Sequence, residues 1–388
     1  MLKKNIKLSA LIFAIIFFQS CEEEVKVPAD SFMVSGTIKG LDTDYMSRSY
    51  KDAQGNRVSD SIFVENGSFT YTAKIDEPTH IIFWPNVERT IKRSGRGYYP
   101  AKSSQFAFLA SPGDHIVFEG EVTDFINAYP SGTKANDDLA KINSKVFPLM
   151  NKSVNLLLEK NKLKENDPQF KVLEDSINNL DEAVVKMKKA FVMANPNSEA
   201  AAWYLSDMMI RSQVTDDEAI TAFNNLDSNL NNYPFYKAVK KRVAGIEATQ
   251  IGKTVENFTT NNTFSGDAFE FNSLKGKYVL IDFWGTWCGP CIAEMPKVKE
   301  YQEKYKDKLI VLGVNQGDSK EQVDKFITPN DYTWTHLMNG KGTDDFVLKF
   351  NVAGFPTKFI IDPEGKILHR FVGDSEESFA VLDGLLGE

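Results

Sequence analysis

The chain has 388 residues, more than one ordinary domain contains, which indicates two or three domains. Hydrophobic residues make up 42% and charged residues 25%, the balance of a soluble globular protein that can bury sizeable cores. The net charge of -8 argues against nucleic acid as a partner, because phosphate binding requires a concentrated basic surface.

Cysteine and histidine are both scarce. The three cysteines are Cys21, Cys288 and Cys291, too few for a disulfide-stapled scaffold or an all-cysteine zinc site. The four histidines are scattered singly, without metal-ligand spacing. We therefore predict no bound metal and no cofactor, and we look to the cysteines for function.

The N-terminus has the pattern of a secretory signal. Lys3, Lys4 and Lys7 precede a largely apolar run at residues 8–18. As a helix this run would rise about 16 Å, roughly half of the ~30 Å hydrocarbon core of a bilayer. Residues 1–20 are therefore predicted to be a signal peptide rather than a transmembrane helix.

Residues 18–21 (FQSC) resemble a bacterial lipobox, in which a small residue precedes the cysteine. The resemblance implies lipidation of Cys21 and a lipid anchor in the cell envelope, on the periplasmic side or at the outer-membrane surface. An ordinary signal peptide with an incidental cysteine is the alternative. Within the linker at residues 21–30, three glutamates resemble the surface-export signals of Bacteroidota lipoproteins, or they are simply solvated.

Residues 31–125 are predicted to form an antiparallel, β-sandwich-like domain. Apolar and polar residues alternate in several short runs separated by turn signals, which is typical of a sandwich. Asn66 and Gly67 lie between two such runs and favour a tight hairpin, because both central residues of a type I′ turn have positive φ.

Residues 134–247 have helical periodicity and are predicted to be a helical middle segment. Apolar side chains recur every three or four positions along residues 139–157 and again along residues 173–191. Pro148 is expected to kink or split the first helix, and Pro196 to end the second. Such stripes also occur in dimerising coiled coils, but packing against helices of the same chain is the more ordinary outcome.

From residue 250 to residue 388 the pattern changes to α/β. Residues 278–284 (YVLIDFW) form a nearly continuous apolar run, as a strand in a sheet buried on both faces requires. The elements expected after this strand are a helix at 290–306, a strand at 309–314, a helix at 320–327, strands at 359–362 and 366–371, and a helix at 376–386.

Cys288 and Cys291 lie where the first strand of this block meets its first helix. Two cysteines three residues apart at a helix start share one face and are close enough to bridge. A bridge across so short a loop stabilises a fold little, which favours a chemical role. Because Cys288 meets the positive end of the helix dipole, it is predicted to attack as a thiolate and Cys291 to act as the resolving thiol.

Residues 281–291 (IDFWGTWCGPC) resemble the active-site stretch of thioredoxin at almost every position. With their flanks, residues 250–388 resemble the exported TlpA/ResA-like thiol:disulfide oxidoreductases, relatives of the AhpC/TSA redoxins. The resemblance implies a thioredoxin-like fold and an enzyme that reduces cysteine pairs of exported proteins by dithiol exchange. Residues 31–125 resemble the β-rich domain of unassigned function that precedes thioredoxin modules in many Bacteroidota lipoproteins.

The same resemblance implies a role for two carboxylates. Asp282 stands where thioredoxins keep a buried carboxylate beneath the disulfide, and Glu294 where the TlpA/ResA-like proteins keep a second one. A carboxyl group in an apolar site has its pKa raised by desolvation, so it can take the proton from Cys291 near neutral pH. A solvated helix residue is the alternative for Glu294.

Residues 354–357 (GFPT) resemble the cis-proline loop that faces the disulfide in this fold. A cis bond before Pro356 would turn the backbone of Phe355 outward, so that its N–H and C=O pair with an extended substrate peptide. Trp287, Phe355 and Pro356 are thus the implied substrate-binding residues. A trans loop proline is the alternative.

Two other functions compete with the reductase. A thiol peroxidase of related fold would carry threonine three residues and proline seven residues before the reactive cysteine, where this chain has Gly285 and Ile281. A surface binding lipoprotein with an idle thioredoxin fold would not need the intact cysteine pair. For the reductase, the expected partners are disulfide-containing exported proteins and a reductant protein of the envelope, because the chain has no second cysteine pair to relay electrons.

Overall fold

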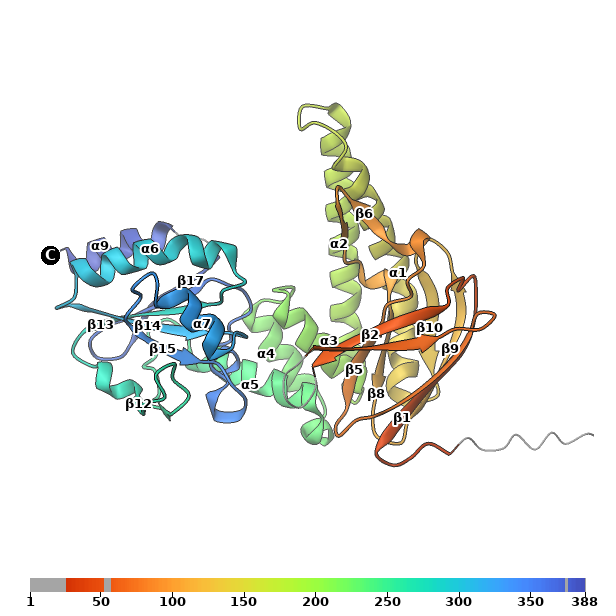
Figure 1. Cartoon of the computed structure of the whole chain (residues 1–388), viewed down its shortest axis with the longest axis horizontal. Helices are drawn as coiled ribbons and strands as arrows, with labels where there is room; N and C mark the ends of the chain where they lie inside the picture. Colours follow the sequence, from red (N-terminus) through yellow and green to blue (C-terminus); the bar gives the residue numbers. More distant parts are fainter. Residues whose placement is uncertain (1–25, 52–56, 374–375, 388) are drawn as a thin grey trace, which may run out of the picture.

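The computed structural model describes residues 26–51, 57–373 and 376–387. The predicted signal peptide, Cys21 and the three glutamates after it lie outside the described residues. In the part that is described, no helix has the length and apolar character needed to cross a bilayer. Figure 1 shows a β-rich region, then a group of helices, then a C-terminal α/β region.

The β-rich region is built on a four-stranded sheet of order β10-β9-β1-β4. Three further strand pairs, β2 with β3, β5 with β8 and β6 with β7, complete it. The bounds are β1 Ser31–Lys39, β2 Tyr45–Lys51, β3 Arg57–Phe63, β4 Ser68–Lys74, β5 Thr79–Phe83, β6 Lys92–Ser94, β7 Gly97–Tyr99, β8 Phe106–Ala110, β9 His115–Val122 and β10 Ile126–Ser131.

Three features of this region differ from the sequence prediction. The block is not wholly antiparallel, because β1 pairs parallel with β9. The last strand, β10, lies beyond the expected end at residue 125 and contains Pro130, a residue that argues against a strand except at a sheet edge, where β10 lies. The tight turn at Asn66-Gly67 is confirmed, with φ of 52° and 75°. The hairpin predicted around it is not, because β3 pairs with β2 and β4 with β1, and among the described residues only the isolated bridge between Glu65 and Ser68 joins the two sides.

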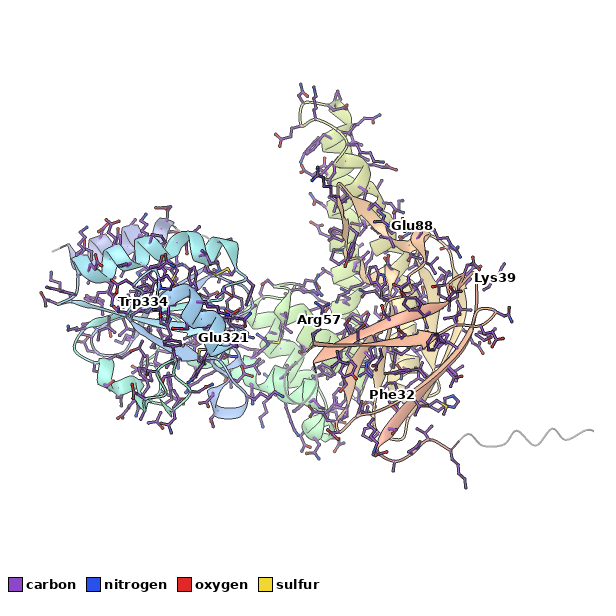
Figure 2. The ribbon with its side chains drawn as sticks, viewed as in Figure 1. Phe32, Lys39, Arg57, Glu88, Glu321 and Trp334 are labelled. Atoms are coloured by element: carbon purple, nitrogen blue, oxygen red, sulfur yellow. A yellow bond between two sulfur atoms is a disulfide. The ribbon has the colours of Figure 1, made fainter. Side chains whose placement is uncertain are left out.

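An aromatic core holds the β-rich region together. Phe32, Phe83 and Phe108 are fully buried, and the ring of Phe108 lies 5.9 Å from that of Phe32 and 5.1 Å from that of Phe83, centroid to centroid. Figure 2 shows Phe32 at the lower end of this region. The apolar residues that alternate with polar ones in the sequence therefore lie on the inward faces of the paired strands.

Five helices follow: α1 Lys134–Lys160, α2 Pro168–Ala194, α3 Glu199–Ile210, α4 Asp216–Asn225 and α5 Pro234–Ala248. α1 and α2 pack against each other within the chain and project from the body as a pair (Figure 1). Pro148 does not split α1, contrary to one of the expected outcomes. Both Pro148 and Ser144 are exposed, so the carbonyl group left without its helical donor faces solvent.

The C-terminal region has a five-stranded sheet of order β15-β14-β13-β16-β17. The strands β13 Tyr278–Trp284, β14 Leu309–Asn315 and β15 Thr335–Met338 are parallel, and β16 Thr357–Ile361 and β17 Ile367–Val372 are antiparallel to their neighbours. The helices are α6 Gly289–Lys304, α7 Lys320–Ile327, α8 Phe346–Lys349 and α9 Glu376–Leu386. The expected strands and helices are confirmed to within two residues at each end.

Two hydrophobic cores cover the two faces of this sheet. One core contains Leu280, Trp284, Cys288 and Cys291 and lies beneath α6. The other contains Val279, Ile281 and Phe283 on the opposite face of the same strand. Adjacent residues of β13 therefore face opposite layers, and this alternation decides which side chains can meet the disulfide.

The helical segment contacts the C-terminal region through α5 and α8. A Cβ atom at Gly245 would lie 2.7 Å from the carbonyl oxygens of both Leu348 and Lys349, so glycine is needed for this close approach. Arg242 adds a hydrogen bond from Nη1 to the carbonyl oxygen of Val352, 3.3 Å long.

A fragment that starts at residue 250 should fold and retain redox activity, because both cores of the sheet lie within residues 255–386. A fragment that starts at residue 233 and keeps α5 is the matched control. Thermal unfolding and insulin reduction by both fragments would measure this. An insoluble or inactive shorter fragment beside an active longer one would show that α5 completes the domain.

Candidate active site

The two cysteines of the C-terminal region form a disulfide where β13 passes into α6. Cys288 is the N-cap residue of α6, and its Cα atom lies 5.3 Å from that of Cys291. Cys288 is 5% exposed and Cys291 2% exposed. The backbone N–H of Cys291 is directed at Sγ of Cys288, at 3.3 Å. In the reduced protein this N–H and the helix dipole favour the thiolate of Cys288.

The loop before Cys288 is held in place by the segment that follows β14. Thr286 donates from both its backbone N–H and its hydroxyl group to the Asp318 carboxylate, each at 2.7 Å. Trp287 donates from Nε1 to the carbonyl oxygen of Gln316 at 2.8 Å. A Cβ atom at Gly285 would lie 2.5 Å from that indole nitrogen, so glycine is required here.

The roles of Asp318 and Gln316 were not predicted from the sequence. Their position in the sequence could have indicated these roles. Both residues directly follow a buried strand that is parallel to β13, so they lie at the same sheet edge as the cysteine loop.

The predicted substrate-binding residues lie together beside the loop. The bond between Phe355 and Pro356 is cis, as expected. The ring of Trp287, which is 57% exposed, contacts the ring of Phe355 edge-on, with centroids 5.2 Å apart. Neither the N–H nor the C=O of Phe355 makes a hydrogen bond with any residue that the structure describes. An exposed apolar patch and unpaired backbone groups therefore adjoin each other.

Three charged side chains share the layer that contains the disulfide. Asp282 lies on β13 between Leu280 and Trp284, which both pack in the disulfide core, so its side chain faces the same layer. Lys358 lies directly opposite Asp282 in the register of β13 and β16. Glu294 follows Cys291 by one helical turn on α6.

Lys358 bridges the two carboxylates. Its Nζ atom contacts Glu294 Oε2 directly and lies 3.7 Å from Asp282 Oδ1. Lys358 is 1% exposed, and the side chain of Glu294 is 10% exposed, so Glu294 is not a solvated helix residue. Burial raises the pKa of Asp282; Lys358 opposes this effect, and Glu294 adds to it. The group can therefore hold a proton on a carboxyl group near the resolving cysteine.

Lys358 was not among the site residues predicted from the sequence. The only signal was a lysine inside the apolar run TKFII, directly after the cis-proline motif. Its partner became visible only when the strand register placed it opposite Asp282. In the residues described, no group of three or more histidines, cysteines, aspartates or glutamates is arranged to hold a metal ion.

Comparison with known proteins assigns a family to this site. Residues 251–370 match the model of the AhpC/TSA family, and residues 32–139 match a domain of unknown function, DUF4369. A thiol-disulfide oxidoreductase ResA of Bacillus cereus is 35% identical over 141 residues, which are 36% of this chain and 79% of the relative. The chain belongs to the TlpA/ResA-like thiol-disulfide oxidoreductases.

Other similar proteins have related descriptions. The thioredoxin-like protein YneN of Bacillus subtilis (strain 168) is 37% identical over 141 residues, with 36% of this chain and 79% of YneN covered. The solved thioredoxin domain of a thiol-disulfide oxidoreductase from Bacteroides vulgatus is 26% identical and covers 35% of this chain and 98% of its own, with a TM-score of 0.32. The match to the ResA relative and to the AhpC/TSA family model confirms the predicted enzyme class, an oxidoreductase.

Cys288 of the reduced enzyme should react with iodoacetamide as a thiolate well below the pH at which an ordinary cysteine does. Half-maximal alkylation is expected roughly near pH 7, against about pH 8.5 for a free cysteine. Alkylation rate against pH in the Cys291→Ser variant isolates the one thiol. A midpoint equal to that of a free cysteine would contradict the assignment of Cys288 as nucleophile.

Lys358→Met should lower the free energy of unfolding by about 3–5 kcal/mol at neutral pH, because it leaves two carboxylates buried without their cation. The loss should shrink at acidic pH, where carboxyl groups are protonated. Urea unfolding between pH 4 and pH 8 measures both effects. Lys366→Met, at an exposed position beside the same sheet, is the control.

Proposed function

We propose that this enzyme reduces disulfides of exported proteins by dithiol exchange through Cys288 and Cys291, while anchored by lipid at Cys21 in the cell envelope. The observation that carries the proposal is the Cys288–Cys291 disulfide at a helix start, in a region whose cis-proline loop has backbone groups without hydrogen-bond partners among the described residues. The anchor rests on the FQSC sequence at residues 18–21 alone.

The reaction begins with the reduced enzyme. The Cys288 thiolate attacks one sulfur of the substrate disulfide, the substrate S–S bond breaks, and the departing substrate thiolate takes up a proton. Cys288 is then joined to the substrate in a mixed disulfide. The α6 N-terminus and the N–H of Cys291 favour the thiolate that starts this step.

Resolution of the mixed disulfide requires Cys291 to lose its proton. In our proposal the buried group of Asp282, Glu294 and Lys358 accepts that proton. The Cys291 thiolate attacks Sγ of Cys288, the mixed disulfide breaks, and the second substrate sulfur leaves as a thiolate that is protonated. Two electrons and two protons have then passed to the substrate, and the enzyme holds its own disulfide.

The substrate segment is proposed to lie extended across the cis-proline loop. The N–H and C=O of Phe355 would pair with its backbone, as an added strand pairs with a sheet edge. The rings of Trp287 and Phe355 would contact an apolar side chain next to the substrate cysteine. This arrangement selects unfolded or extended segments rather than one particular sequence.

The oxidised enzyme needs an external donor of two electrons. Cys288 and Cys291 are the only cysteines after Cys21, so no second pair in the chain can reduce them. We therefore propose that a reductant dithiol protein of the envelope closes the cycle by the same exchange in reverse.

Insulin reduction measured beside peroxide consumption tests the proposal. We expect insulin reduction that Cys288→Ser abolishes, and peroxide consumption no faster than with the Cys288→Ser variant. Peroxide consumption without insulin reduction would instead establish a thiol peroxidase. Equal insulin reduction by the wild type and Cys288→Ser would instead indicate a binding protein whose thioredoxin fold is catalytically idle.

Substrate identity is tested by a trap. In Cys291→Ser the mixed disulfide cannot be resolved, so envelope proteins joined to Cys288 can be named by mass spectrometry. The double variant Cys288→Ser/Cys291→Ser is the control for non-covalent capture. Recovery of only cytoplasmic proteins from intact cells would contradict an envelope location. A mature N-terminus without lipid at Cys21 would contradict the lipid anchor.

A further inference from the structure

A cavity of about 240 Å³ lies between the β-rich region and the helical pair, far from the cysteines in the sequence. It opens among η2 (Lys102–Ser104), which follows β7, the helices α1 and α2, and the residues after α3. Its lining residues used below are Lys102, Ser103, Met150, Val154, Asp181, Val184, Lys188 and Arg211. We call it the Lys188 cavity.

Lys188 is an unpaired buried cation. Three lysines are buried among the described residues, and two of them have anionic partners: Lys92 with Asp124, and Lys358 with Glu294. Lys188 is 2% exposed and makes no hydrogen bond or ion pair with any residue that the structure describes. The ring of Tyr204 lies beside its ammonium group, with 5.7 Å from Nζ to the ring centroid. A buried ammonium without a partner is costly, which points to a missing anion.

The charges around Lys188 leave an excess of cations. Asp207 is shared between Lys102, at 2.6 Å, and Arg211, at 3.0 Å. Asp181 accepts a hydrogen bond from Ser153 at 2.7 Å and does not reach Lys188. The cavity therefore has one cation more than its nearby carboxylates can balance.

The pKa of Lys188 agrees with the excess of positive charge around it. Burial lowers its pKa to about 8, and the charge of Lys102 acts in the same direction. Arg211 also lowers the pKa, whereas Asp207 and Asp181 raise it. An anion placed on Nζ would offset the burial and keep the ammonium charged.

The other residues that line the cavity indicate which further groups and what size its ligand has. Ser103 is 0% exposed, and its hydroxyl group has no hydrogen-bond partner among the described residues, so it is available to donate to an anion. Met150 and Val154 on α1 and Val184 on α2 form an apolar wall. The cavity is smaller than the roughly 300–1,000 Å³ of drug-sized ligand sites, so its ligand is small.

We propose that the Lys188 cavity binds a small organic monocarboxylate, with its carboxylate on Lys188 Nζ and Ser103 Oγ and its apolar chain against α1 and α2. One unpaired cation matches one carboxylate, and the apolar wall matches a short hydrocarbon chain. The site is independent of the redox chemistry, and it gives the N-terminal part of the chain a ligand-binding role.

Calorimetry of the full chain with hexanoate, hexan-1-ol, hexylamine and inorganic phosphate tests the proposal. We expect saturable binding of hexanoate alone. Its affinity should fall between pH 7 and pH 9.5, because burial lowers the pKa of Lys188 to about 8 and the side chain loses its proton in this range. Burial also lowers the pKa of the neighbouring Lys102, which acts in the same direction. Equal binding of hexan-1-ol would show a merely apolar cavity, and binding of phosphate without hexanoate would show an inorganic anion site. Either result would overturn the proposal.

Two variants assign the binding to the named residues. Lys188→Met should abolish hexanoate binding, and the variant should fold because it removes a buried unpaired charge. Ser103→Ala should weaken binding about tenfold or more, through loss of one hydrogen bond to a charged group. Lys186→Met, an exposed lysine on the same helix, is the control and should bind as wild type does. Unchanged affinity in Lys188→Met would refute the site.

Discussion

The Cys288–Cys291 pair should equilibrate with a glutathione redox buffer at a potential below about -220 mV, on the reducing side. Gly289 and Pro290 between the cysteines are the thioredoxin dipeptide. Thioredoxin lies at about -270 mV and the oxidant DsbA at about -120 mV, a gap of roughly 7 kcal/mol for two electrons. That gap is large enough to decide the direction of exchange.

The surroundings of the disulfide support the reducing side. DsbA is oxidising because its thiolate is strongly stabilised, with a pKa of about 3.5. Here the buried cation Lys358 contacts one carboxylate and lies near a second. These two negative charges offset its positive charge, so it stabilises a nearby thiolate little. His336, against Trp284 in the same region, has its pKa lowered to about 4 by burial and is neutral.

Tryptophan fluorescence is the readout, because Trp284 and Trp287 flank the cysteine loop. The Cys288→Ser/Cys291→Ser variant, which cannot cycle, provides the baseline. A potential close to that of DsbA would reverse the proposed direction and make this enzyme an oxidase.

Asp282→Asn and Glu294→Gln should each slow resolution of the mixed disulfide by about 10²–10⁴-fold, the range for loss of general acid–base catalysis. Formation of the mixed disulfide should change far less, since Cys288 rather than Cys291 performs that step. Stopped-flow kinetics with a fluorescent disulfide peptide separates the two phases. Glu300→Gln, at an exposed position on the same helix, is the matched control.

The pH dependence distinguishes a catalytic from a structural effect of Asp282. Its pKa is raised by burial, so in wild type the resolution rate should rise with pH as this group ionises. The folded protein then binds more protons than the unfolded chain between the two pKa values, so stability falls as pH rises through that window. Asp282→Asn should remove this slope and be the more stable protein at pH 7. Wild-type resolution rates in both carboxylate variants would exclude a general base.

Much of the C-terminal region was predictable because its signals are local. The run at residues 278–284 is apolar almost without interruption, since both faces of β13 are covered, and the CGPC motif follows at the helix start. The cis-proline loop was recognised from residues 354–357. These features depend on side chains within a few positions of one another, so the sequence alone determined them.

The N-terminal region was less predictable, because strand pairing is not local. Alternation predicted strands, but not that β1 would pair parallel with β9, about eighty residues later. Pro148 was expected to kink or split a helix, yet α1 continues through it, because apolar residues on both sides of Pro148 pack in the same core.

The cysteine pair, the fold of the C-terminal region and the reaction class could therefore be predicted from the amino-acid sequence. The pairing of the buried charges could not, because it depends on how distant segments pack. Asp282 and Lys358 are seventy-six positions apart, and only the register of β13 on β16 places one opposite the other. Lys188 and Ser103 are eighty-five positions apart and line the same cavity only because the fold brings the helical pair against the β-rich region. Whether a buried charge is stabilised depends on which charged groups the fold places within a few ångströms of it. The spacing of residues along the sequence does not give the distances between these groups.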